Sequence, residues 1–373
     1  PRSHESSVTS RVDVVSRATR RASSDSACSS GKNEKSIYGE AMRAVVLDTY
    51  GGTEVLGLRD IPSPVLGPDE VLVDVVATAL NAADLLQRQG LYPGPSVLDG
   101  DGNAYEVPGM EFSGTVAAVG ARVAGAKVGD PVMGIVGGGS YAEQLVTHER
   151  LLMPVPASVS LADAAAIPEV FVTAFDALVA QGGLTAGRTA LVHAGASGVG
   201  TAAIQIAKAI GARIVVTTST GKVERCRELG ADVVVDYTTD DFVAACKETT
   251  GGRGVDVVLD VIGGEYLARN LSSVGTGGRI IQVGVMGGGP AEVNLGVVLM
   301  KKAQIIGTTL RSRPVEEKIA ICRRFVTEVL PWFDLGALSP VIDRRYPLAD
   351  IAAAHEYLAE NTSVGKVLID VMR

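Results

Sequence analysis

One segment in the middle of the chain restricts the possible folds more than any other. Residues 191–220 have the sequence LVHAGASGVGTAAIQIAKAIGARIVVTTST. A short apolar run leads into a turn of small residues, a helical pattern follows, and a second β-branched run ends the segment. A strand, a tight turn, a helix and another strand in this order predict a βαβ unit with two parallel strands.

The turn of this unit has the composition of a dinucleotide-binding turn. Residues 195–200 have the sequence GASGVG. Small side chains let backbone N–H groups approach a pyrophosphate, and the start of the helix adds partial positive charge. A glycine triplet alone could be no more than a tight βα turn, but the flanking strand and helix favour a nucleotide site.

Strands and helices are predicted to alternate around this unit. Val, Ile and Leu runs predict strands at 191–194, 214–218, 233–235, 255–261 and 280–283, and helical patterns fall near 199–210, 222–229 and 241–249. Such alternation implies a doubly wound parallel sheet with right-handed crossovers, as in a Rossmann domain.

The chain before this region follows a different pattern. From Met42 to about Pro156, short β-branched runs are broken by Gly and Pro turns, which predicts a small barrel-like β domain. A last strand-helix-strand pattern follows residue 329, and we expect it to return to the first domain because the doubly wound sheet is already complete. The predicted domains are 42–163 with 329–373, and 164–328.

Residues 1–41 differ in composition from the rest. They are rich in Ser and Arg and poor in large apolar residues, so they cannot bury a core of their own. Two interpretations stay open: a disordered extension, or an organelle targeting segment. We expect the protein in the cytoplasm, or in a mitochondrion or chloroplast if this segment is a transit peptide.

Composition excludes several classes of function. A net charge of −8 argues against nucleic acid as a partner, and no run approaches the roughly 20 apolar residues of a membrane span. The four cysteines form no CxxC pair, and the four histidines lack metal-ligand spacing, so no metal site is predicted. His193 is expected to be packed, and His148 and His355 to be at the surface.

The end of the second strand indicates which dinucleotide binds. NAD-binding units place an acid there for the ribose hydroxyls, but this strand ends in Thr218, Ser219 and Thr220. Lys222 adds a positive charge, although it could be a solvated lysine at the start of a helix, and Tyr237 could supply another hydroxyl. These residues favour NADPH over NADH.

Several long motifs point to a known family. The chain contains ALNAADLLQRQGLY, VPGMEFSGTV, AAAIPEVFVTAF, HAGASGVGTAAIQIAK and LRSRP. From Met42 to Val371 it resembles the medium-chain dehydrogenase/reductase superfamily, and within it the zinc-free quinone oxidoreductases. The resemblance implies an α/β protein with a GroES-like β-rich catalytic domain, a Rossmann domain and a homodimeric assembly.

The resemblance also implies roles for individual residues. It places Tyr92 and Ser197 in the substrate and nicotinamide cleft as catalytic candidates, although Tyr92 could be a packed aromatic residue and Ser197 a turn residue. The residues implied to bind the cofactor are Asn81, Ala196, Ser197, Gly198, Val199, Ser219, Lys222, Tyr237, Gly284, Val285, Met286, Thr309, Leu310 and Lys366.

Zinc is not expected. In the zinc alcohol dehydrogenases of this superfamily, a cysteine and a His-Glu pair help to hold the catalytic metal. In this chain Asn81 lies in the segment of that cysteine, and Met110 precedes Glu111 where the histidine would be. An amide and a thioether cannot replace imidazole and thiolate as zinc ligands.

The segment after Tyr92 is longer than the resemblance predicts. Asp99, Asp101 and Asn103 resemble the start of an EF-hand loop, but the downstream Gly and Glu spacing is missing. We therefore expect a solvated surface loop up to about Glu106, close to the substrate entrance.

Three functions are compatible with these residues. The first is NADPH-dependent reduction of a quinone, including ortho-quinones, in which negative charge develops on oxygen and Tyr92 or Ser197 could donate a hydrogen bond. The second is NADPH-dependent reduction of an enone or enal double bond. The third is NADPH binding without catalysis.

Overall fold

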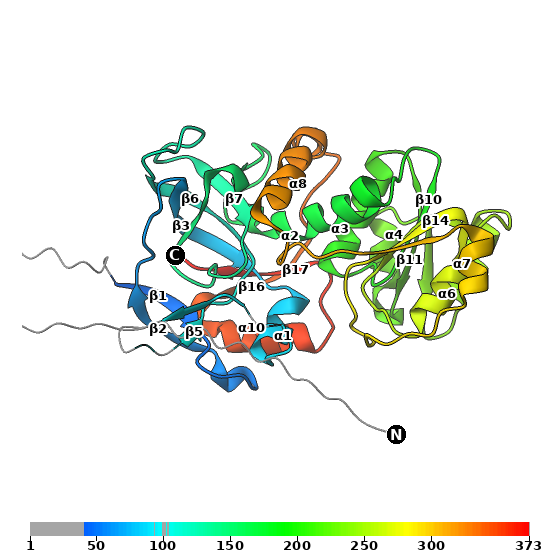
Figure 1. Ribbon diagram of the computed structural model, residues 1–373, viewed down its shortest axis with the longest axis horizontal. Coiled ribbons are helices and arrows are strands. Elements are labelled where there is room, and N and C mark those ends of the chain that lie inside the picture. Colours follow the sequence, from blue (N-terminus) through cyan, green and yellow to red (C-terminus); the bar gives the residue numbers. More distant parts are fainter. Residues whose placement is uncertain (1–40, 93, 99–101, 103, 373) are drawn as a thin grey trace, which may run out of the picture. The chain divides into compact units, whose positions relative to one another are not determined.

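The structure is a computed structural model that describes residues 41–92, 94–98, 102 and 104–372, all within the compact unit Tyr38–Arg373. Residues 1–40 of the predicted extension, and Asp99, Asp101 and Asn103 of the predicted loop, lie outside the described residues. Two large sheets organise the described part (Figure 1).

The first large sheet is fully parallel and has the order β12-β11-β10-β13-β14-β15. This is the doubly wound order, in which the chain builds outward from β10 on one side and then crosses to β13 on the other. The carboxyl ends of all six strands therefore meet at one edge. The strands are β10 (Thr189–Val192), β11 (Arg213–Thr218), β12 (Val233–Asp236), β13 (Val255–Asp260), β14 (Val274–Gln282) and β15 (Gln304–Gly307).

Helices connect these strands, and the first three begin and end within one or two residues of the predicted positions. Two later helices and β15 were not predicted. The sixth helix buries the polar residues Asn270 and Ser273 beside its apolar ones, and the seventh exposes Leu295, Leu299 and Met300, so burial in these two helices does not follow the apolar pattern alone. The helices are α3 (Gly198–Ala209), α4 (Val223–Glu228), α5 (Phe242–Thr249), α6 (Tyr266–Ser273) and α7 (Leu295–Lys301).

The second large sheet is mostly antiparallel and combines both ends of the described chain. The C-terminal strand β17 pairs antiparallel with β3, which also pairs with β6 and β8. The strands are β3 (Glu70–Ala79), β6 (Glu111–Val119), β7 (Pro131–Ile135), β8 (Gln144–His148), β9 (Met153–Pro154), β16 (Ile342–Pro347) and β17 (Lys366–Asp370). Two predictions, the GroES-like β-rich domain and the Rossmann sheet, match this architecture; the predicted domain boundaries stay a proposal.

Two short strand pairs and three helices accompany the second sheet. Helix α2 begins with Pro at its first position, where the missing N–H costs no hydrogen bond, and continues into a π-helical segment, Asp176–Gln181. These elements are β1 (Ala41–Val46), β2 (Gly57–Pro62), β4 (Ser96–Leu98), β5 (Ala104–Glu106), α1 (Ala82–Arg88), α2 (Pro168–Phe175) and α10 (Ile351–Ala359).

The predicted surface loop is partly regular structure. Strands β4 and β5 pair antiparallel, so the described residues on either side of the gap form two arms of a hairpin. Glu106 is only 5% exposed and exchanges two backbone hydrogen bonds with Leu47, of 2.8 and 2.9 Å. The expectation of a wholly solvated loop was therefore wrong at Glu106, because backbone pairing holds that end.

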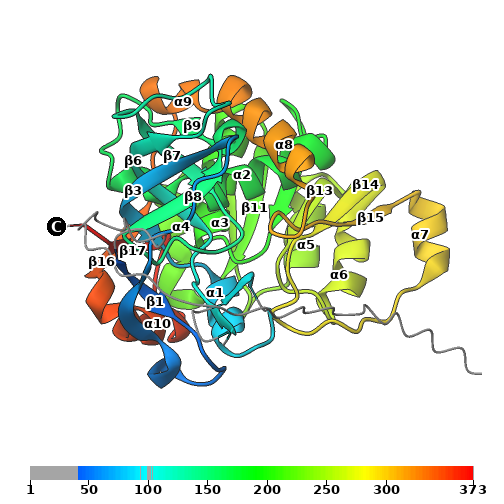
Figure 2. The same ribbon diagram turned by 60° about the vertical axis from the view of Figure 1, so that its left-hand side comes forward.

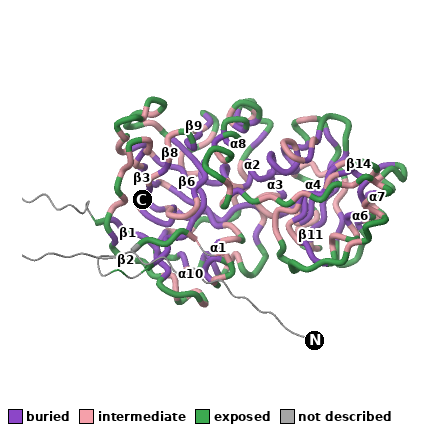
Figure 3. The backbone as a smooth tube through the Cα atoms, in the orientation of Figure 1, coloured by how far each residue is buried: buried purple, intermediate pink, exposed green. Residues whose placement is uncertain are grey.

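The main apolar core lies between α2, α3, the parallel sheet and α8 (Val315–Glu328). Figure 2 shows α8 beside α2, and Figure 3 shows α2 and the central strands around β11 largely in purple, whereas the segment with α7 is largely green. Phe171 packs edge-on against Phe333, and Phe175 against Phe325. No helix of the described residues is both long and apolar enough to span a membrane.

All three cysteines in the described part are free and buried. Burial raises the pKa of Cys226 to about 11 and the pKa values of Cys246 and Cys322 to about 12. These thiols stay protonated at neutral pH, and the fourth cysteine, Cys28, lies outside the described residues.

The histidines differ from expectation at one position. His193 is packed, as predicted, and contacts Thr217 at 3.0 Å and Asn270 at 2.8 Å. His355 was expected at the surface but is fully buried in α10, because the second sheet and Tyr141 cover that face of the helix. Burial, together with the charge of Arg88, lowers the pKa of His355 to about 3.

We predict that His355 makes the protein acid-sensitive. The unfolded chain protonates this histidine below its ordinary pKa of 6.5 and the folded chain does not, so stability falls as the pH drops from 6.5 towards 3. Between pH 7 and pH 5 the wild type should lose about 2 kcal/mol more unfolding free energy than His355→Gln. Denaturant titrations at both pH values measure this difference, with His148→Gln as the control; equal losses in wild type and His355→Gln would contradict it.

Candidate functional site

The glycine-rich turn begins with a left-handed residue. Ala194 has a φ of 55°, which turns the chain sharply from β10 towards α3. A Cβ atom on Gly195 would lie 2.7 Å from Cβ of Val216 on β11, and one on Gly200 would overlap the carbonyl oxygen of Ala194. The two glycines are therefore needed for their small size, which lets the turn lie directly on the sheet.

This turn fits a dinucleotide pyrophosphate. Gly198 and Val199 occupy the first turn of α3, so their N–H groups have no acceptor within the helix. Ser197 caps the helix by accepting a hydrogen bond from the N–H of Gly200, at 3.1 Å. The cap leaves the hydroxyl hydrogen of Ser197 available as a donor.

The residues predicted to bind the adenosine end lie on adjacent loops. Ser219 follows β11 and Tyr237 follows β12, and these strands pair in parallel so that Thr218 faces Asp236. The ammonium of Lys222 lies 3.2 Å from Oδ1 of Asn361, and its partial burial lowers its pKa. The structure thus brings a lysine and the hydroxyl residues to the same edge of the sheet.

The predicted nicotinamide-side residues follow the next strands at that edge. Gly284 comes after β14, and Val285 and Met286 are 54% and 65% exposed. Thr309 and Leu310 follow β15, where Leu310 is buried and Thr309 is exposed. Exposed apolar side chains at the carboxyl edge of such a sheet are available to cover a flat ring.

Lys366 joins the glycine turn to the second sheet. Its aliphatic chain passes over Gly198, where a Cβ atom would lie 2.7 Å from Cδ of Lys366. Its buried ammonium donates to the carbonyl of Leu80 (2.6 Å) and to Oδ1 of Asn81 (2.7 Å), and pairs with Oε1 of Glu111 (2.8 Å). Any contact of Lys366 with the cofactor stays a prediction, and its three N–H groups already have acceptors.

Asn81 and Glu111 form a hydrogen bond with each other, in addition to their contacts with Lys366. The amide nitrogen of Asn81 donates to Oε1 of Glu111 at 2.9 Å, and Asn81 caps α1 in a reciprocal arrangement with Asp84. Oε2 of Glu111 accepts the backbone N–H of Glu169 at 2.8 Å. Both side chains are therefore engaged with protein groups at the positions that correspond to zinc ligands in the resemblance.

Tyr92 is held by a cation, Arg311, from the segment that follows β15. The guanidinium of Arg311 lies 5.0 Å from the centre of the Tyr92 ring and donates to the Tyr92 carbonyl at 3.1 Å. It also donates to Oε1 of Gln87 at 2.9 Å and to the carbonyl of Gly137 at 2.6 Å. Burial raises the pKa of Tyr92, which keeps its phenol protonated as a hydrogen-bond donor.

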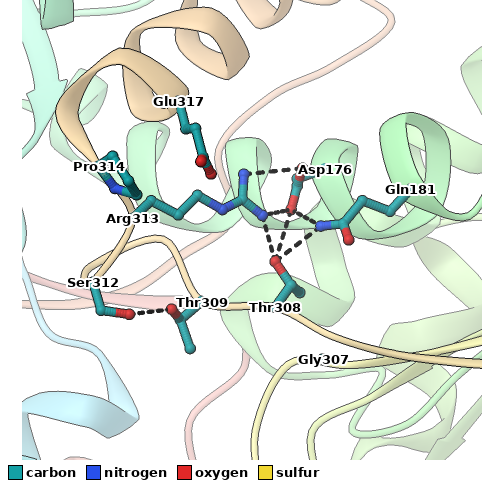
Figure 4. A pocket seen from close by; sticks show the side chains of 9 residues that line it. All are labelled: Asp176, Gln181, Gly307, Thr308, Thr309, Ser312, Arg313, Pro314 and Glu317. Atoms are coloured by element: carbon teal, nitrogen blue, oxygen red, sulfur yellow. Dashed lines mark hydrogen bonds and ion pairs between the residues drawn. The ribbon is translucent and has the colours of Figure 1, made fainter.

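A polar cavity of about 520 Å³ lies beside this region (Figure 4). Among the residues predicted from sequence to line the site, only Thr309 borders it. Figure 4 shows Arg313 pointing at Asp176, with an ion-pair distance of 2.5 Å, and Thr308 and Gln181 completing the network. The ion pair fixes the segment between β15 and α8, and the same segment carries Arg311.

Sequence reasoning missed three residues of this site, namely Arg311, Glu111 and Glu169. Each had a signal in the sequence. Glu111 and Glu169 are single acids in apolar segments, which is unusual unless a partner is present. Arg311 is in the quoted LRSRP motif, but its long reach to Gln87 could not be inferred from spacing.

Comparisons with known proteins match both halves of the chain. A family model described as "Alcohol dehydrogenase GroES-like domain" matches residues 67–157. A second, described as "Zinc-binding dehydrogenase", matches residues 198–324. The first match covers β3 and β6 to β9 of the second sheet, and the second match covers α3 and the strands β11 to β15 of the parallel sheet.

Full-length relatives agree with these matches. The chain is 33% identical to a quinone oxidoreductase of Lama guanicoe, over 88% of this chain and 97% of that protein. It is 30% identical to a chloroplastic NADPH-dependent alkenal/one oxidoreductase of Arabidopsis thaliana, over 88% and 79%. A quinone oxidoreductase structure from Pseudomonas syringae aligns with a TM-score of 0.79 and 32% identity, over 88% of this chain and all of that one. The chain belongs to the quinone oxidoreductase branch of the medium-chain dehydrogenase/reductase superfamily, a superfamily of nicotinamide-dependent oxidoreductases.

Proposed function

We propose that this protein is an NADPH-dependent quinone oxidoreductase that works without zinc. The observation that carries the proposal is the buried ammonium of Lys366. It donates to Asn81 and forms an ion pair with Glu111 beside the glycine turn. The proposed dinucleotide turn thus lies beside Asn81 and Glu111, whose side chains already have protein partners. Bound NADPH supplies a hydride from C4 of its nicotinamide.

The residues of this chain would position the substrate and handle its charge. Reduction of a quinone places negative charge on an oxygen, and a protonated phenol or hydroxyl nearby can stabilise it. Tyr92, held by Arg311, and Ser197 at the start of α3 are the donors that we propose for this role. The half-buried ring of Tyr92 also offers a face on which a quinone can stack.

Cofactor preference follows from the loops after β11 and β12. A 2′-phosphate carries negative charge, so neutral hydroxyls and a lysine favour it where a carboxylate would repel it. Ser219, Lys222 and Tyr237 supply that environment in our proposal. Lys222 donates to the neutral amide oxygen of Asn361 at 3.2 Å, and the charge of Asp343 is nearby without a salt bridge to Lys222 among the described residues, which leaves the ammonium available to a phosphate.

Reduction of an enone or enal is the second candidate. Its support is the Arabidopsis relative, whose name states activity on alkenals and alkenones. In that reaction the hydride goes to a carbon and a proton must reach the neighbouring carbon. The same cleft residues would serve, so the two candidates differ in substrate and not in architecture.

We expect the wild type to oxidise NADPH faster with ortho-quinones than with enals. It should prefer NADPH to NADH, and a chelator should leave its rate unchanged.

Lys222→Ala should lower kcat/KM for NADPH by about 10-fold or more, because a charge-assisted hydrogen bond is lost, and should leave kcat/KM for NADH unchanged. Lys247→Ala, at an exposed lysine on α5, is the control. Steady-state kinetics on a quinone and enone panel decides; NADH preference or inhibition by the chelator would reject the proposal.

Tyr92 is tested by removing first its hydroxyl and then its ring. Tyr92→Phe should lower kcat by about 10-fold or more if the hydroxyl stabilises developing charge, while Tyr92→Ala should also raise KM because the stacking face is lost. Steady-state rates on several quinones measure the effects of each variant on kcat and on KM separately. Unchanged turnover in both variants would remove Tyr92 from the mechanism.

We also propose a homodimer that forms at the free edge of the parallel sheet. Strand β15 is the last strand of that sheet, and its Ile305 is 41% exposed. Leu295, Leu299 and Met300 of the nearby α7 are each at least 75% exposed. An unpaired edge with apolar neighbours is a surface that a second copy can cover.

A charge at this edge should dissociate the dimer. Ile305→Lys places an ammonium against the same group of the second copy, so sedimentation equilibrium should show a monomer where the wild type shows a dimer. Val65→Lys makes the same type of change at a residue that is 88% exposed elsewhere, and it should stay dimeric. A monomeric wild type, or a dimeric Ile305→Lys, would contradict the interface.

A further inference from the structure

The cluster around Lys366 contains more acids than cations. Asp84, Glu111 and Glu169 lie close enough for their charges to interact, with Lys366 as their nearest ammonium. Glu111 accepts from Lys366, from Asn81 and from the N–H of Glu169, so both of its carboxyl oxygens have donors. The N–H groups of Lys366 are all used elsewhere, so none reaches the carboxyl of Glu169.

Glu169 and Asp84 each have one carboxyl oxygen without a partner among the described residues, and Glu169 is the more exposed of the two. Glu169 is the second residue of α2, and its Oε2 is buried with no hydrogen-bond partner among the described residues. The residue as a whole is only partly buried, so it lies between the cluster and the surface. A buried carboxylate without donors is costly, whereas a carboxylic acid in the same place is not.

The charged groups around Glu169 act on its pKa in opposite directions, and burial makes the largest contribution. Burial and the charge of Glu111 on β6 raise the pKa of Glu169 to about 8, Asp84 of α1 adds to the rise, and Lys366 of β17 and Arg311 oppose it. Cys322 of α8, a protonated thiol, and Tyr92 also interact electrostatically with Glu169. Glu169 is thus an acid at neutral pH.

Glu169 also acts on the proposed substrate side of the cleft. Its charge contributes, after burial, to the raised pKa of Tyr92, so the two side chains are close enough to interact. The phenol of Tyr92 is a weaker acid than usual because its pKa is raised. Asp84 is only 1% exposed, and its carboxyl accepts a hydrogen bond from the N–H of Asn81. Among the three acids of the cluster, Glu169 is the most exposed, since Asp84 and Glu111 are at most 1% exposed.

We propose that Glu169 is the general acid of the reduction, a role that rests on the proposed function. A quinone that has accepted a hydride, with its electron pair, is an anion and needs one proton to become a hydroquinone. The O–H bond of Glu169 breaks, the new O–H bond of the product forms, and Glu169 becomes a carboxylate that solvent reprotonates. For an enone, the same proton would go to the carbon next to the carbonyl.

The proposal is tested with a variant that removes the acidic proton of Glu169 and keeps the shape of its side chain. Glu169→Gln should lower kcat about 100-fold or more on substrates with weakly acidic products, such as enones, because general acid catalysis is lost. It should have little effect on electron-poor quinones, whose hydroquinones can leave as anions. Glu169→Asp should recover part of the rate, and NADPH affinity should be the same in all variants.

The pH profile gives an independent measurement. The wild-type kcat should fall as the pH rises through about 8, because the protonated form of Glu169 is the active one, and Glu169→Gln should lack this fall. Glu316→Gln, at an exposed acid in the first turn of α8, should keep the wild-type profile. An infrared band of a protonated carboxyl at pH 7, in the protein without cofactor, should disappear in Glu169→Gln.

Two outcomes would overturn the role of Glu169 while the wild type reduces quinones. One is a Glu169→Gln enzyme with wild-type rates and pH profile. The other is an equal loss on every substrate, which indicates a structural role. A wild type that reduces neither quinones nor enones would instead reject the proposed function, and the proton donor with it.

Discussion

The buried ammonium of Lys366 is the interaction on which the site depends. Its stem packs over Gly198 of the parallel sheet's first turn, and its charge satisfies Glu111 at the start of β6. Removal of this ammonium would leave a charge buried without a partner, which typically costs about 3–5 kcal/mol. The geometry of the glycine turn and that of the second sheet are therefore coupled through one side chain.

A second residue, Arg311, also links the two sheets, but it reaches from the parallel sheet to the loop that carries Tyr92. Arg311 belongs to the segment after β15, which the Arg313–Asp176 ion pair fixes, yet its guanidinium holds the loop that carries Tyr92. The segments that we propose for the cofactor side and the substrate side of the cleft thus share an anchor. Changes in the position of Thr309 or Leu310 on cofactor binding would be transmitted directly to the ring of Tyr92.

Sequence alone predicted the elements whose pattern is local. The strand-turn-helix order around Gly198 and the β-branched runs gave the parallel sheet, because periodicity and turn chemistry are properties of neighbouring residues. The cluster of Lys366, Asn81 and Glu111 joins residues 285 positions apart in one contact, which no local pattern can indicate. His355 was misplaced for the same reason, since burial of one face of α10 depends on the second sheet.

Quinones and enals are electrophiles that attach to thiolates, so an enzyme that concentrates them risks covalent self-inactivation. Cys226, Cys246 and Cys322 are enclosed by the core and remain in the neutral thiol form, which is a poor nucleophile. The described part of the chain therefore offers its own substrates no accessible thiol to alkylate, and catalyst lifetime is protected by the same packing that stabilises the fold.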